Sequence, residues 1–172
     1  MVGIDLFPLY LSLKVAAVAT AGVVVLGLPL AWILARRRFW GREMLAALVM
    51  LPLVLPPTVL GYYLLLALGR QGFLGRFLEN FWGINIIFTW QAAVGASFVV
   101  SLPLLVRAAQ AAIEAVSTEL EDAARTLGRS EMAIFFTLTL PLAWRGVLAG
   151  VVLTFARAMG EFGATLMVAG NI

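Results

Sequence analysis

Hydrophobic residues gather in four long runs along this chain, separated by shorter segments that carry most of the charged side chains. The runs cover about residues 9–35, 44–68, 84–106 and 141–169. A helix of about 20 apolar residues is long enough to cross the hydrocarbon core of a bilayer. The pattern therefore predicts an all-α, multi-pass integral membrane protein with about four spans.

The segment after the first run is strongly basic. It contains Arg36, Arg37, Arg38 and Arg42. Cytoplasmic loops of membrane proteins carry an excess of Lys and Arg, so we expect this loop in the cytoplasm and the amino terminus outside. We do not expect the amino-terminal segment to be a cleavable signal peptide. Its apolar run is too long for the hydrophobic region of a signal peptide, and the basic cluster follows that run instead of preceding it.

The second run contains three prolines, Pro52, Pro56 and Pro57. Because proline lacks an N–H group, three of them in a membrane helix predict a bend. The bend is either fixed by packing alone, or it lines a translocation path at Pro56 and Pro57. Residues 69–83 then predict a short helix on the outer membrane surface, or a docking surface for an external protein.

Composition agrees with a membrane protein and narrows the chemistry. The chain is 63% hydrophobic and 12% charged, whereas soluble domains carry about 25% charged residues. The net charge of +3 comes from arginines beside the apolar runs, which indicates orientation and not nucleic-acid binding. The chain has no Cys and no His, which excludes disulfides and thiolate metal sites and removes the commonest general base.

Residues 107–140 form a polar, amphipathic interruption that is longer than a link between two spans requires. Thr118 and Glu121 have the spacing of a capping box at a helix start. Gly128 suits a helix end, and Ser130 can cap a second helix. Pro141 fits the start of the fourth span, where its missing N–H has no cost. We therefore expect a helix, a glycine turn and a second helix that present a surface to a soluble partner.

This interruption resembles the EAA loop of ABC importer permeases. The family pattern is Glu-Ala-Ala, three residues, Gly, nine residues, an aliphatic residue, any residue and then Leu-Pro. This chain has these matching positions at the same intervals: Asp122, Ala123, Ala124, Gly128, Leu138, Leu140 and Pro141. The acidic position holds Asp122 and is preceded by Glu121, so either carboxylate is a candidate for the acidic role.

The resemblance implies the transmembrane domain of a type I ABC importer in a bacterial inner membrane. The small Ala123 and Ala124 would let a coupling helix enter a groove on an ATPase subunit. That separate subunit would bind ATP and magnesium, because the only lysine, Lys14, lies in an apolar run and not in a P-loop. A permease homodimer and a periplasmic or lipid-anchored binding protein are the other implied partners, and no cofactor is expected on this chain.

Residues 155–165 and 170–172 resemble sequence blocks of molybdate importer permeases, and residues 51–61 and 69–73 resemble their second span and outer loop. The resemblance implies molybdate as cargo, with sulfate, thiosulfate and tungstate as alternatives. Because those permeases continue into another span, we expect this sequence to be C-terminally truncated. An autonomous channel or secondary transporter is an alternative of another class, which would need no ATPase.

Two charges interrupt the fourth run. Arg157 and Glu161 are four residues apart, so they share a helix face and can pair. A charge at this depth costs at least about 2.5–3.5 kcal/mol unless it faces protein or water. The pair is either a structural ion pair or a gate element in which the arginine contacts a passing oxyanion. In the same run, Gly146 and Gly150 form a Gly-x-x-x-Gly segment, a weak indication of a dimer contact.

Overall fold

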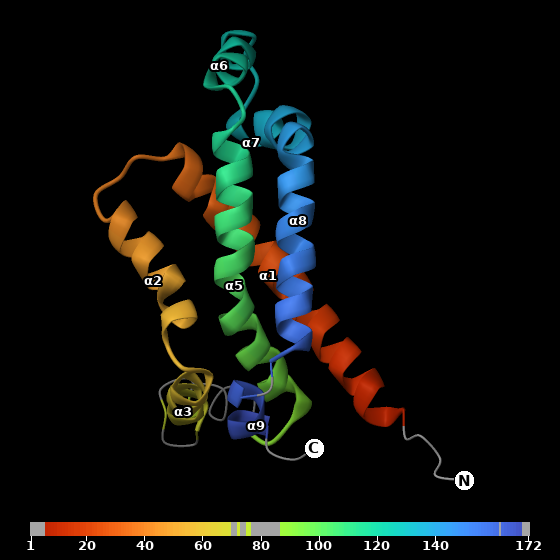
Figure 1. Cartoon of the computed structure of the whole chain (residues 1–172). Coiled ribbons are helices and arrows are strands. Elements are labelled where there is room, and N and C mark those ends of the chain that lie inside the picture. Colours follow the sequence, from red (N-terminus) through yellow and green to blue (C-terminus); the bar gives the residue numbers. More distant parts are fainter. Residues whose placement is uncertain (1–5, 70–71, 73–74, 77–86, 162, 170–172) are drawn as a thin grey trace.

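The computed structural model describes residues 6–69, 72, 75–76, 87–161 and 163–169. These residues form helices, and no strand occurs among them. Three long helices, α1 (Phe7–Arg36), α5 (Trp90–Glu114) and α8 (Leu140–Met159), form a bundle in which each contacts the other two (Figure 1). Each belongs to a helical stretch that is long and apolar enough to cross a membrane.

Small residues allow α5 and α8 to approach closely. A Cβ atom added to Gly146 would lie 2.4 Å from the Cβ of Ala112, and one added to Gly150 would lie 2.9 Å from the Cβ of Ala108. Only glycine fits where two membrane helices come this near. The Gly-x-x-x-Gly segment is therefore covered by α5 of the same chain, and its interpretation as a dimer contact is wrong.

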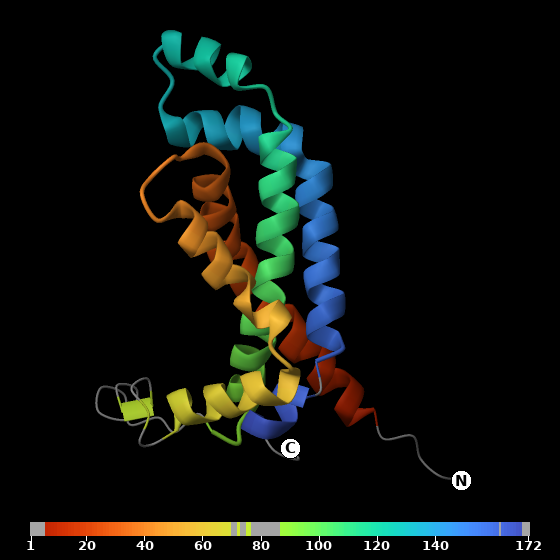
Figure 2. The ribbon, with the colours of Figure 1, turned by 60° about the vertical axis from the view of Figure 1, so that its left-hand side comes forward.

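The second hydrophobic run is two helices, α2 (Arg42–Val54) and α3 (Pro57–Leu68), which meet at an angle of 114°. The bend expected from the prolines is confirmed. Pro56 precedes the first residue of α3 and Pro57 begins the helix, where proline is well tolerated. Figure 2 shows α3 lying across one end of the bundle, while α2 runs beside it.

The fourth run is also broken, which differs from the single span expected over residues 141–169. Helix α8 ends at Met159 and α9 (Gly163–Ala169) follows. The break has a local cause, because Glu161 accepts a hydrogen bond from the N–H of Ala164 at 2.8 Å and so caps α9. Helix α9 packs closely on α3, since a Cβ on Gly61 would lie 2.9 Å from the Cα of Ala164.

The third run differs at its inner end. Helix α5 continues eight residues past the expected end at Val106, to Glu114. Residues 84–86, where this span was expected to begin, lie outside the described residues, as does most of the surface helix expected over 69–83.

The polar interruption contains α6 (Thr118–Thr126), α7 (Glu131–Ile134) and the π-helical turn η1 (Phe135–Thr139). Figures 1 and 2 both show α6 beyond the end of the bundle, opposite to α3 and α9. A buried cluster anchors its base, with side chains from α1, α5, η1 and α8: Leu34, Val106, Ile113, Phe135 and Val147. Helix α6 thus projects beyond the end of the bundle, next to a well-packed apolar cluster.

Candidate functional site

The cap of α7 and the turn after α6 agree with the sequence prediction, whereas the cap of α6 does not. Ser130 accepts a hydrogen bond from the N–H of Ala133 at 3.3 Å, which confirms the predicted cap of α7. Gly128 has a φ of +78°, a conformation that favours glycine, and α6 ends before it as expected. The cap of α6 differs from the prediction: Ser117 accepts from the N–H of Glu119 at 3.2 Å, so the helix begins at Thr118.

Glu121 is buried and the adjacent Asp122 is exposed. The Glu121 side chain is 2% exposed, whereas that of Asp122 is 68% exposed. The Glu121 carboxylate accepts a hydrogen bond from Nε of Arg36 at 3.0 Å and another from the Thr139 hydroxyl at 2.7 Å. The same Arg36 donates to the carbonyl of Val116 at 2.9 Å. Glu121 therefore holds α6 to the body of the chain, and Asp122 is the acidic side chain that faces outward.

Arg125 joins α6 to α7 across the Gly128 turn. Its guanidinium pairs with Asp122 at 2.5 Å and with Glu131 at 2.6 Å. The hydrogen bonds that Arg125 donates to Glu131 and then to Asp122 raise the pKa of Arg125 above its ordinary value. Because these three side chains are exposed or half-buried, the pairs orient the turn more than they stabilise it.

The outward face of α6 combines small, acidic and apolar side chains. Ala123 is exposed and Ala124 is half-buried. Leu120 is 50% exposed, and Leu127 at the end of the helix is 84% exposed. Helix α5 ends at Glu114 and α6 begins at Thr118 in a new direction (Figure 1), so Leu120 and Leu127 do not continue the buried face of α5. The two leucines are instead available to a partner.

The last two residues of the sequence pattern lie at the base of α6 and not on its face. Leu138 is half-buried and packs against the cluster beneath α7 and η1. Pro141 was expected to begin a separate helix, but it is the second residue of α8 in a continuous helical stretch, Glu131–Met159. The π-helical turn just before it gives a wider backbone at the point where proline cannot donate to a carbonyl four residues earlier.

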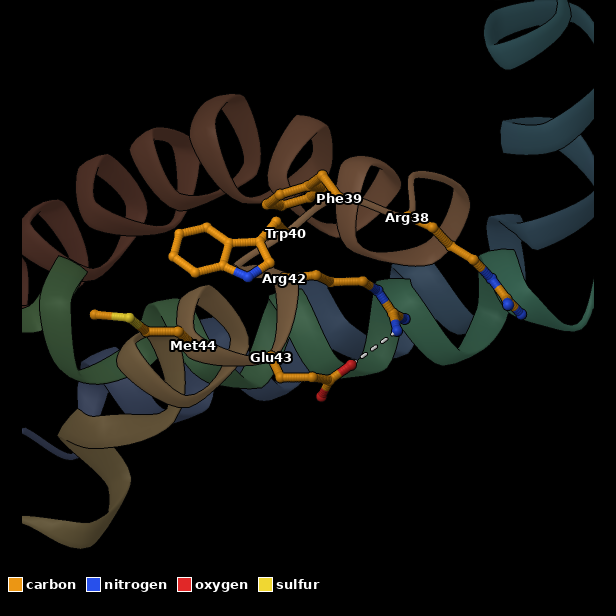
Figure 3. Close-up of a pocket in the computed structure, with 7 residues that line it drawn as sticks. Arg38, Phe39, Trp40, Arg42, Glu43 and Met44 are labelled. Atoms are coloured by element: carbon orange, nitrogen blue, oxygen red, sulfur yellow. Dashed lines mark hydrogen bonds and ion pairs between the residues drawn. The ribbon is translucent and has the colours of Figure 1, made fainter.

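The sequence interpretation did not identify Arg36 and Thr139 as partners of Glu121. Arg36 was assigned only to the basic orientation signal, and its partner is 85 residues away. Arg42 also has partners within the chain, since it donates to the carbonyl of Leu34 at 2.8 Å. It also pairs with Glu43 at 3.0 Å (Figure 3). No local pattern marks which arginines of a basic loop turn inward.

The second candidate region joins the two helix breaks. Arg157 pairs with Glu161 at 2.6 Å, with side chains 32% and 1% exposed. A Cβ on Gly163 would lie 2.9 Å from the Cβ of Pro57 and 3.9 Å from a carboxylate oxygen of Glu161. Pro56 precedes Pro57 at the start of α3. The structure therefore brings together side chains that the sequence places about 100 residues apart.

In both regions the charged side chains form ion pairs with one another. Among the residues that the structure describes, no three His, Cys, Asp or Glu side chains are grouped as metal ligands. The buried carboxylates are matched by arginines, Glu121 by Arg36 and Glu161 by Arg157. The outward face of α6 presents two exposed apolar side chains, Leu120 and Leu127, beside the charged Asp122.

Comparison with known proteins gives consistent matches over most of the chain. A family described as "Binding-protein-dependent transport system inner membrane component" matches residues 27–172. The molybdenum transport system permease proteins ModB of Haemophilus influenzae and of Escherichia coli K12 are each 49% identical over 162 residues, which is 94% of this chain and 71% of each relative. A putative molybdenum transport system permease protein of Bacillus subtilis, YvgM, is 45% identical over 96% of this chain and 73% of its own length.

Proposed function

Because the chain belongs to the family of binding-protein-dependent transport system inner membrane components, we propose that it is the permease subunit of an ABC importer for molybdate. The observation that carries this proposal is α6, which projects from the bundle with Asp122 outward and Glu121 bound inside. Several relatives that are 43–49% identical are described as molybdenum transport permeases, which supports molybdate as the cargo.

We assign ATP hydrolysis to a separate ATPase subunit that binds ATP and magnesium and docks on α6. Ala123 leaves room for a helix to enter a groove, and Leu120 and Leu127 supply apolar area that lacks cover from the chain. Asp122 adds a charge that a basic side chain of the ATPase can match. In this arrangement the permease chain makes no covalent intermediate and acts by moving its helices.

The distribution of arginines supports an orientation with α6 in the cytoplasm of a bacterium and the amino terminus outside. The basic loop after α1 lies at the end of the bundle that carries α6. Arg107 is near the end of α5 that leads to α6, Arg129 lies between α6 and α7, and Arg145 is near the start of α8. The opposite end, with α3 and α9, would face a periplasmic or lipid-anchored binding protein. A second copy of the chain would complete the pore.

We place the translocation path beside Arg157. Its side chain is partly exposed while its partner Glu161 is buried, so the guanidinium can reach a passing oxyanion on its exposed side. Pro56 and Pro57 fix the bend of the neighbouring α2–α3 pair. Because Glu161 neutralises the arginine, the contact suits passage of a dianion better than tight binding.

The proposal is tested by uptake of labelled molybdate into vesicles that contain the full-length permease, with and without the ATPase and binding protein. We expect accumulation only when ATP and both partners are present, with weak competition from excess sulfate. Stronger competition by sulfate or tungstate would reassign the cargo. Uptake without the ATPase would instead indicate an autonomous channel or secondary transporter and would contradict the proposal.

A further inference from the structure

Glu121 is the single residue of α6 that is buried. A short helix on a protein surface is normally held by an apolar side chain, because burial of apolar area is favourable without any partner. Here an acidic side chain takes that place, and its burial requires partners. The attachment of α6 therefore depends on the groups that bind this one carboxylate.

Arg125 of α6 itself lies 3.7 Å from the Glu121 carboxylate, and the two groups that bind this carboxylate more closely belong to other elements. Arg36 is the last residue of α1, and its guanidinium bridges the Glu121 carboxylate and the Val116 carbonyl just after α5. Thr139 is the last residue of η1, is fully buried, and donates to Glu121 immediately before α8 begins. The Glu121 carboxylate thus connects α6 to the end of α1 and to the start of α8, and Arg36 extends this contact to the residues after α5.

The nature of the contacts suits the transfer of movement. Apolar surfaces slide past each other at small cost, whereas hydrogen bonds to a charged group are directional and strong. A buried ion pair often adds little net stability, because the charges lose their hydration. An apolar residue would hold α6 equally well, so the charged contact indicates a role in geometry.

We propose that Arg36, Glu121 and Thr139 form a positioning joint through which movement of α6 is passed to α1 and α8. This inference rests on the proposed function, in which an ATPase moves α6. Asp122 and the outward face of α6 receive the partner, and Glu121 on the inward face transmits the displacement. The residues act through helix position and do not contact the cargo.

The direct test is Glu121→Gln in the complete transporter, which keeps the shape and an acceptor for Thr139 but removes the charge. We expect molybdate transported per ATP hydrolysed to fall at least about fivefold, within the usual range of coupling between sites. The ATPase should still co-purify, because Asp122 and Ala123 are unchanged. Glu43→Gln, a change of an exposed acidic side chain on α2 and outside the docking face, is the matched control and should leave the ratio at its wild-type value.

If Glu121→Gln transports as much molybdate per ATP hydrolysed as the wild type, the proposed joint is contradicted. An equal fall in transport and in ATP hydrolysis gives the same unchanged ratio and contradicts it as well. If that variant fails to assemble, Thr139→Val and Thr139→Ser decide the question, since only the second keeps the hydroxyl. We expect Thr139→Val to lower the ratio and Thr139→Ser to restore it, and equal ratios would overturn the joint. Failure of the proposed function is separate, because it would already appear as wild-type protein without ATP-driven uptake.

Discussion

The ion pair at the break between α8 and α9 sets an order of stability for three variants. Glu161 is 1% exposed and accepts from the N–H of Ala164, while Arg157 is 32% exposed. Arg157→Gln would leave a buried carboxylate without its counter-charge, a loss of about 3–5 kcal/mol for a buried pair. Glu161→Gln keeps an acceptor for Ala164 and leaves an arginine that can turn outward, so about 1.5–3 kcal/mol is expected.

The double variant distinguishes a coupled pair from two independent side chains. With both residues changed to Gln no buried charge remains, so it should be more stable than Arg157→Gln alone. The measurement is the free energy of unfolding of the four proteins in one detergent, arranged as a double-mutant cycle. Losses that simply add would refute the reasoning, because they would show that the two charges do not depend on each other.

The same double variant also separates structure from transport. Since it restores the packing without the cation, its uptake rate reports on contact with the oxyanion. We expect reduced molybdate uptake at normal assembly. Wild-type uptake would show that Arg157 is only a structural partner of Glu161 and would remove it from the proposed path.

Two further changes test packing and docking. Gly146→Ala should destabilise the chain by about 1–3 kcal/mol, because its Cβ would lie 2.4 Å from that of Ala112, more than about 1 Å inside ordinary contact. Gly95→Ala, with nothing within 4 Å, should instead gain up to about 1 kcal/mol in the same unfolding assay, and equal effects would contradict the packing. Asp122→Asn should change stability by less than about 1 kcal/mol, since its ion pair is exposed, yet lower ATP-driven uptake and retention of the ATPase. Retention and uptake at wild-type levels would remove Asp122 from the docking face.

Local patterns in the sequence predict much of this fold. The hydrophobic runs indicate the long helices, because a span must be apolar over its whole length. The bend at Pro56 and Pro57, the turn at Gly128 and the cap at Ser130 each depend on a few neighbouring atoms. These features were predicted because the physics that determines them lies within about five residues.

Other features depend on contacts that a linear pattern does not contain. Glu121 and Asp122 are adjacent, so a rotation of about 100° on the helix decides which one is buried. That rotation is set by Arg36, which is far away in the sequence. The sequence does not predict the break after Met159, because apolar residues resume after Glu161 and extend to Ala169, and the cap that Glu161 provides for α9 is a local contact. Tertiary partners therefore decided the details that matter for the site.

The central claim is that an ATPase drives import through the outward face of α6. Its most direct test is ATP-dependent molybdate uptake by Ala123→Arg, which places a long charged side chain on that face. Because Ala123 is exposed, the variant should fold and reach the membrane normally. We predict that it neither retains the ATPase nor accumulates molybdate. Uptake at the wild-type rate with the ATPase bound would contradict the claim.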